Sequence, residues 1–152
     1  IPAAESALRI VALAGDAKVG EQTAPARFTV TCRPDAVLEA SLDIPEALGF
    51  DSDPFEGPEG IGLERPLLSL ALGKGGATSY YVNGWWIDSS VFTFALTPSA
   101  LEVSRWLSRS GQRLRIEVQP PDAGAPALRA EFLLPQEIQV FDAAVRPCLR
   151  AG

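Results

Sequence analysis

Two strand patterns and one helix pattern follow one another in RLRIEVQPPDAGAPALRAEFLLPQEIQVFDAAVRPC, residues Arg113–Cys148. In Arg113–Val118 charged and branched apolar side chains alternate, which is the period of a strand buried on one face. The alternation stops in the Pro- and Gly-rich segment 119–124 and resumes in Leu128–Leu134. Two alternating runs joined by turn-forming residues predict an antiparallel hairpin.

The period then changes from that of a strand to that of a helix. Apolar side chains recur at spacings of three, four and three residues, on Ile138, Phe141, Val145 and Cys148. This single stripe predicts an amphipathic helix over residues 136–146. Pro147 is expected to end it, because proline lacks the backbone N–H that a helix interior needs. Cys148 would then lie at the buried side of the helix end.

The chain has two cysteines, which could form a disulfide, remain as core thiols or supply half of a metal site. A metal site is the weakest of the three, because the chain has no histidine and no CxxC pair. Cys32 shares a strand face with Phe28 and Val30, so both cysteines are expected to point inward. We therefore expect a Cys32–Cys148 disulfide, and with it a periplasmic or secreted location, since disulfides persist in oxidising compartments.

Composition limits the class of protein. A chain of 152 residues with 47% hydrophobic residues suits one domain, residues 1–152, with its own core. No apolar run approaches the roughly 18 residues of a membrane helix, so no membrane insertion is expected. The chain has no methionine and starts at Ile1-Pro2, which fits a mature protein whose signal peptide has been removed. Cleavage of a tag at an internal boundary is the alternative.

The net charge of −6 argues against nucleic-acid binding, which requires a basic surface. It is compatible with a basic protein partner, although acidity also serves solubility alone.

Further strand patterns occupy residues 7–13, 27–33, 37–44, 66–72 and 91–96. A second helix is expected over residues 98–110, because Ser99 and Glu102 have the spacing of a capping box. Val103 and Leu107 would face inward in this helix, with Trp106 at the edge of the stripe. We therefore predict an α+β domain, in which an antiparallel β-sheet or sandwich of about eight strands packs against two helices.

The segment Pro45–Gly62, the acidic loop, is long and rich in turn-forming residues, with Phe50 and Phe55 to hold it against the core. Loops of this length are often functional. Its carboxylates are Asp51, Asp53, Glu56 and Glu59, together with Glu46 at its start. The first four could surround a calcium ion, although their spacing is not that of an EF-hand. A solvated acidic loop without a metal is the simpler interpretation.

An aromatic cluster follows at residues 78–88 and comprises Tyr80, Tyr81, Trp85 and Trp86. Adjacent residues of a strand face opposite ways, so one member of each pair should face away from the core unless a bulge re-aims it. Outward aromatic side chains are typical of recognition surfaces. The alternative is that they cover a second core layer or the C-terminal helix.

Few residues could support catalysis. The chain has no histidine, no GxSxG motif, and only two lysines, Lys18 and Lys74, both beside turns. The segment Gly73–Gly76 lacks the ending of a phosphate-binding loop and is interpreted as a turn. A bridged cysteine pair offers no thiol nucleophile. We expect no enzyme activity and no cofactor; a hydrolase that uses two carboxylates is the remaining catalytic alternative.

The order of elements in the last third resembles small exported proteobacterial proteins of the invasion-associated locus B type. It is also similar to periplasmic accessory proteins encoded with type VI secretion systems. The shared order is a helix (Ser99–Ser110), a glycine, the strands Arg113–Val118 and Leu128–Leu134, and then Phe141-Asp142-Ala143-Ala144. Val140 replaces the glycine that precedes the phenylalanine in those proteins. The resemblance implies a β-rich domain of the bacterial envelope and supplies no catalytic residue.

These observations favour an exported, non-catalytic protein-binding module. It would be an envelope or secretion accessory factor, or an inhibitor of the immunity-protein type that faces a basic partner. The expected contact residues are Tyr80, Tyr81, Trp85, Trp86, Asp51, Asp53, Glu56 and Glu59. A small-ligand or glycan-binding domain, with Trp85 and Trp86 as a stacking platform, is the alternative. The sequence specifies no oligomeric state.

Overall fold

A computed structural model describes residues 9–33, 37–107, 112–122 and 124–151. These residues form nine strands: β1 (Arg9–Val19), β2 (Gln22–Cys32), β3 (Leu38–Pro45), β4 (Leu68–Leu72), β5 (Thr78–Tyr80), β6 (Asn83–Asp88), β7 (Val91–Leu96), β8 (Arg113–Val118) and β9 (Leu128–Leu133). The α-helices are α2 (Ala100–Leu107) and α3 (Gln139–Ala151), and short 3-10 helices are η1 (Glu46–Leu48), η2 (Asp53–Phe55) and η3 (Ile61–Leu63).

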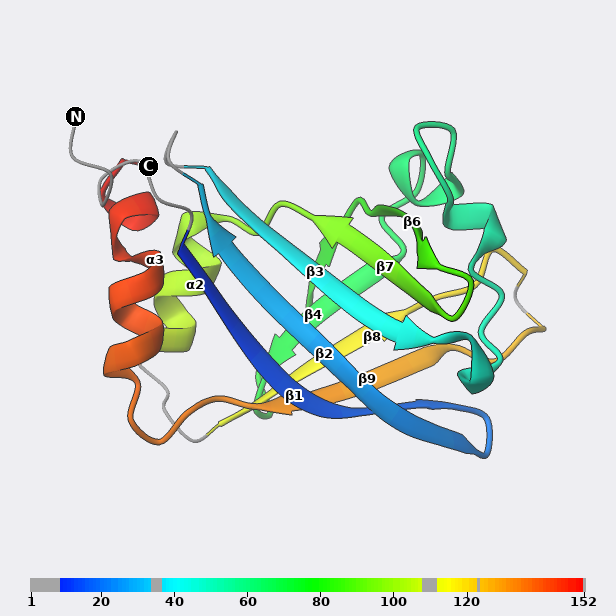
Figure 1. Cartoon of the computed structure of the whole chain (residues 1–152), viewed down its shortest axis with the longest axis horizontal. Coiled ribbons are helices and arrows are strands. Elements are labelled where there is room, and N and C mark those ends of the chain that lie inside the picture. The colour runs from blue at the N-terminus through cyan, green and yellow to red at the C-terminus, as the bar shows by residue number, and fades with distance from the viewer. Residues whose placement is uncertain (1–8, 34–36, 108–111, 123, 152) are drawn as a thin grey trace.

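All nine strands belong to one antiparallel sheet with the order β5-β4-β8-β9-β1-β2-β3-β7-β6. The sheet is strongly curled, and both helices lie at the same end of it (Figure 1). The predicted α+β class with a mostly antiparallel sheet is confirmed. The sandwich is not observed, because the strands form one continuous curled layer. The strand number exceeds the expected eight because the aromatic segment 78–88 divides into β5 and β6.

The two edge strands of the sheet are neighbours in the chain. β5 and β6 lie at opposite ends of the strand order, yet only Tyr81 and Val82 separate them. Three Cα steps span at most about 11 Å, so the two edges must approach each other where this link crosses. We call this place the seam. A short link between opposite edges requires the sheet to curl.

The core fills the concave side of the sheet. Its largest fully buried side chains are Trp106, Phe28, Phe55, Phe92, Phe94, Phe132, Phe141, Leu42, Leu48, Leu68, Leu70 and Leu114. Helices α2 and α3 close one end, where the Trp106 ring lies 6.0 Å from that of Phe28 and 6.4 Å from that of Phe141. Trp106 is therefore central to the core, and its expected position at the stripe edge was wrong. Each of these edge-to-face pairs adds about 0.5–1.5 kcal/mol beyond area burial.

The helix boundaries differ from those predicted. α2 begins at Ala100, where the Glu102 N–H donates to Ser99 Oγ at 3.1 Å, as the capping box predicts; residues 108–110 of the expected helix lie outside the described residues. The predicted C-terminal helix is present as α3, but it begins at Gln139 and continues through Pro147 to Ala151, so the predicted bounds 136–146 and the stop at Pro147 were wrong. Within the described residues, no helix is long and apolar enough to span a membrane.

α3 tolerates Pro147 because its buried stripe extends past the proline. Phe141, Val145 and Cys148 are all at most 2% exposed, and Pro147 itself is exposed. Proline removes one backbone hydrogen bond and crowds the preceding turn, at a cost of about 3 kcal/mol. Burial of residues on both sides of the proline, and the covalent bond at Cys148, offset this cost.

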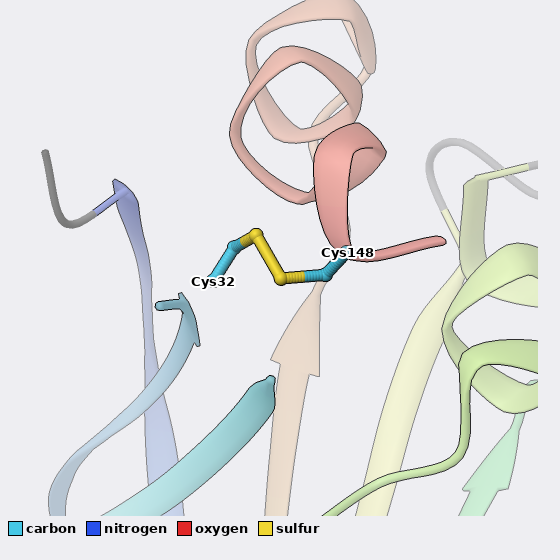
Figure 2. Close-up of a disulfide and its surroundings, with 2 residues drawn as sticks. All are labelled: Cys32 and Cys148. Carbon is cyan, nitrogen blue, oxygen red and sulfur yellow. A yellow bond between two sulfur atoms is a disulfide. The ribbon is translucent and has the colours of Figure 1, made fainter. Parts of the chain in front are cut away.

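The predicted disulfide is present and joins the end of β2 to α3 (Figure 2). The Cα atoms of Cys32 and Cys148 are 5.8 Å apart, and both residues are 2% exposed. They are the only two cysteines of the chain, so no free thiol remains. The bond is consistent with an oxidising compartment.

Candidate functional site

The acidic loop lies along the seam and pairs with β6. Glu56 forms a parallel bridge with Gly84, whose carbonyl accepts a hydrogen bond from the Gly57 N–H at 2.8 Å. On the far side of the loop, the Val82 N–H donates to the Gly62 carbonyl at 2.9 Å. The loop therefore covers part of the β6 edge, which would otherwise expose unpaired backbone groups. No local sequence pattern indicates this pairing, which places the acidic loop beside the aromatic strand.

Glycines permit this close approach. A Cβ at Gly62 would lie 2.1 Å from the Val82 carbonyl oxygen, and one at Gly84 would lie 2.2 Å from the Thr93 carbonyl oxygen. Neither distance is possible for a real side chain, so backbone would have to move at either position. Gly62 thus permits the backbone contact at the seam, and Gly84 permits the close contact between β6 and β7.

Aromatic packing holds the acidic loop on the core, as predicted. The ring of Phe55 is fully buried and lies 5.4 Å from that of Phe94, while Phe50 lies 5.8 Å from Phe55. These contacts fix the loop backbone between two anchors. The carboxylates between and after the anchors therefore have a defined position beside β6.

The aromatic cluster divides as the strand period predicts. Tyr81 is 57% exposed and Trp85 is 48% exposed. Tyr80 and Trp86 are instead partly buried and pack against the core, with the Trp86 ring 5.2 Å from that of Phe92. Of the four predicted aromatic contact residues, the structure places Tyr81 and Trp85 at the surface. The prediction of one outward member in each pair is confirmed.

Two apolar residues extend this exposed surface and were missed from the sequence. Ile87 is 57% exposed and lies two residues after Trp85, where the register of β6 against β7 shifts between Trp86 and Asp88. Leu63 is 42% exposed and lines one hollow with Tyr81. We call Leu63, Tyr81, Trp85 and Ile87 the β6 strip. No local pattern indicates Leu63.

Two hollows adjoin the β6 strip. One has a volume of about 330 Å³, and small side chains of β3 and β7, including Ser41, Thr93 and Ala95, line it together with Trp85. The other has a volume of about 400 Å³ and contains Tyr81. Both are lined by Asn83, Ala95, Leu96 and Thr97, so the two hollows adjoin each other. The outer face of this flank is therefore recessed between its exposed rings.

The acidic residues lie at the surface of the same region. Asp51, Asp53, Glu56 and Glu59 are all exposed. Within the described residues, no three Asp, Glu or Cys side chains are placed to hold a metal ion, and the structure therefore gives no support to the calcium interpretation. The acidic loop provides negative charge to this surface.

Asp88, the last residue of β6, adds a further charge next to Ile87. Its carboxylate accepts hydrogen bonds from the Ser90 hydroxyl at 2.6 Å and the Ser90 N–H at 2.7 Å. These bonds lower the pKa of Asp88 below its ordinary value, because they favour the ionised form. The carboxylate at this end of the strip is therefore ionised at neutral pH.

The geometry describes an exposed aromatic and aliphatic strip with a recessed flank, beside a loop with four exposed carboxylates. No protein-family model, curated protein or solved structure matches this chain. The chemistry of this surface is therefore the basis for any functional assignment.

Proposed function

We propose that this protein is an exported, non-catalytic module that binds another protein through the β6 strip. The observation that supports it is the gathering of Leu63, Tyr81, Trp85 and Ile87 on one flank, each between 42% and 57% exposed. Large apolar side chains exposed singly are ordinary, whereas adjacent ones indicate an interaction surface. Aromatic side chains contribute most of the binding energy at many interfaces.

The acidic loop favours a basic partner. Asp51, Asp53, Glu56 and Glu59 have no basic residue among them in the chain from 51 to 59. Within the same loop, the Gly57 N–H donates to the carbonyl of Gly84, which directly precedes Trp85. Charges at the rim of an apolar surface mainly raise the association rate and select against partners of like charge. A partner with an apolar centre and lysine or arginine around it would fit both features.

The disulfide supports export, since the two cysteines would be kept reduced in a cytosol. We propose the periplasm as the compartment, in agreement with the sequence resemblance to small envelope proteins. An envelope accessory factor and an inhibitor of the immunity-protein type both fit this location.

The decisive experiment compares matched leucine variants. Leu63→Ala removes an apolar side chain from the β6 strip, and Leu133→Ala removes one of similar exposure (49%) from β9. A partner captured from periplasmic extract is identified, purified and titrated against each variant by calorimetry. We expect Leu63→Ala and Trp85→Ala to weaken binding by about tenfold or more, as for central interface residues, and Leu133→Ala to leave it unchanged. Equal affinity of all three variants would exclude the strip.

The contribution of the acidic loop has a separate test. Reversing the charges of Asp51, Asp53 and Glu56 to lysine should slow association at low salt, and the effect should shrink as salt screens the charges. A triple variant that still binds as well as the wild type at low salt would remove the loop from the interface.

A second candidate function follows from the Trp85 hollow. Its volume of about 330 Å³ and its hydroxyl-bearing lining, which includes Ser41 and Thr93, suit one or two sugar rings stacked on the indole. Trp86 cannot share this platform, because it packs inward on Phe92. Titration of soluble glycans with Trp85→Phe as the variant distinguishes the two functions. Glycan binding that Trp85→Phe abolishes, without any protein partner, would favour the sugar site.

A further inference from the structure

A separate cavity of about 780 Å³ lies between the Gly73–Gly76 turn, helix α2 and the start of β8. None of its lining residues belongs to the β6 strip or to the acidic loop. The turn was expected from the sequence, and Gly73 has the positive φ of 57° that such a turn favours. The cavity was not expected, because its walls come from three parts of the chain.

Positive charge lines this cavity. Its side chains include Lys74, Arg105, Arg113 and Arg115, and a single carboxylate, Glu102. The protein as a whole has a net charge of −6, so the cavity is opposite in sign to the molecule. A concave site lined by one sign of charge concentrates counter-ions of the other sign. The ligand expected here is therefore anionic.

The backbone on one side of the cavity is held in place. Arg115 Nε donates to the Gly73 carbonyl at 2.7 Å, and the Gly73 N–H donates to the Arg113 carbonyl at 2.8 Å. One arginine thus fixes the turn that presents Lys74. Preorganisation of this kind lowers the entropic cost of binding.

The carboxylate contacts of two of the arginines are long. Arg113 lies 4.0 Å from Glu131, and Arg105 lies 3.7 Å from Glu102; both arginine side chains are more than 60% exposed. Exposed pairs at such distances contribute little to stability. A phosphate group can therefore replace the Arg113–Glu131 contact at small cost.

We propose that this cavity binds a small phosphorylated ligand through Lys74, Arg105 and Arg113. Arginine donates two parallel hydrogen bonds to a phosphate, and lysine adds a mobile point charge. The phosphate could belong to a soluble molecule or to a lipid headgroup, and both would use the same cations. This site is independent of the β6 strip and of the protein-binding function.

The test uses the full chain and two probes, inorganic pyrophosphate in solution and vesicles of phosphatidylglycerol. Binding is measured by calorimetry and by amide chemical shifts of Gly73, Gly75 and Gly76, at low ionic strength because salt screens exposed charges. Lys74→Gln with Arg113→Gln should weaken binding by about tenfold or more. Lys18→Gln with Arg27→Gln removes the same charges from exposed positions of β1 and β2 and should preserve it.

A third variant should act in the opposite direction. Among the described residues, Glu102 is the only carboxylate that lines the cavity. Glu102→Gln removes it and keeps a residue that suits the capping box, so binding should tighten several-fold. An unfolded or distorted variant would not bind more tightly.

The two probes distinguish a soluble ligand from a lipid headgroup. Binding of pyrophosphate indicates a soluble ligand, and binding of vesicles alone indicates a headgroup; either supports the site if the cavity variants respond as stated. Absence of binding to both probes overturns the proposal. An equal loss in the control pair also overturns it, because the attraction would then be a property of the whole surface.

Discussion

Removal of the Cys32–Cys148 bond is expected to lower the free energy of unfolding by about 5 kcal/mol. The two cysteines are 116 residues apart. The chain-entropy relation for a loop of that length gives roughly 4.9 kcal/mol at 25 °C. Domains of this size are stable by about 5–15 kcal/mol in total, so a third or more of the stability would be lost. With about 2.1 cal/mol/K of unfolding entropy per residue, the midpoint temperature should fall by about 15 °C.

Urea unfolding of oxidised and reduced wild type, followed by tryptophan fluorescence, measures this difference without changing a side chain. Cys32→Ala with Cys148→Ala should resemble the reduced protein, and addition of reductant should leave that variant unchanged. Reagents for free thiols should detect none in the native oxidised protein, since both cysteines are bonded. Oxidised and reduced proteins that unfold within about 1 kcal/mol of each other would refute the entropic reasoning.

Other consequences of the structure are testable by single substitutions. Gly62→Ala should destabilise by about 1–3 kcal/mol in urea unfolding, because its Cβ would overlap backbone, while Gly76→Ala, which has open space, should change stability by less than about 1 kcal/mol. Pro147→Ala should stabilise the protein by up to about 3 kcal/mol and raise its helical circular dichroism; no gain would mean that α3 is not continuous there. Ser90→Ala should raise the pKa of Asp88, measured by NMR titration. The pKa of Asp88 is lowered in the folded state, so its hydrogen bonds to Ser90 stabilise the protein fully at pH values above the ordinary pKa of aspartate. This stabilisation is lost as the pH falls through the lowered pKa of the folded state.

The positions of individual strands could be predicted from the sequence, whereas their pairing could not. The bounds of β7 and β8 match the alternating runs 91–96 and 113–118, because a half-buried strand records its own period in the sequence. The pairing of β3 with β7, and of β9 with β1, joins residues far apart in the chain, and no local pattern specifies it. The same reason explains why one curled sheet could not be distinguished from a sandwich.

Pro147 shows how tertiary packing overrides a local rule. Proline lowers helix stability wherever it occurs in an interior, and by propensity alone it should end α3. Val145, two residues before the proline, and Cys148, one residue after it, are both buried. Cys148 is also bonded to Cys32 at the end of β2. The helix continues because ending it would lose these contacts.

The period of a strand predicts part of the candidate surface from the sequence. The remaining residues come together only in the folded chain. Alternation along a strand predicts one outward residue in each aromatic pair, and the structure shows that these are Tyr81 and Trp85. Leu63 and the cations of the 780 Å³ cavity could not be predicted, because each looks like an ordinary exposed residue in its own segment. Only the folded chain brings Lys74, Arg105 and Arg113 to one place.

The seam links the fold to the proposed binding surface, and this restricts which variants can test function. The acidic loop meets β6 through backbone hydrogen bonds at Gly57 and Val82, so a substitution that moves the loop also moves the strand beneath Trp85. Loss of binding in Gly62→Ala would therefore report on the seam rather than on the interface. Trp85 points away from the core and shares no hydrogen bond with the loop within the described residues. The substitution Trp85→Ala changes the surface and leaves the backbone contacts of the seam intact. A loss of binding in this variant would therefore mean that the indole itself contacts the partner.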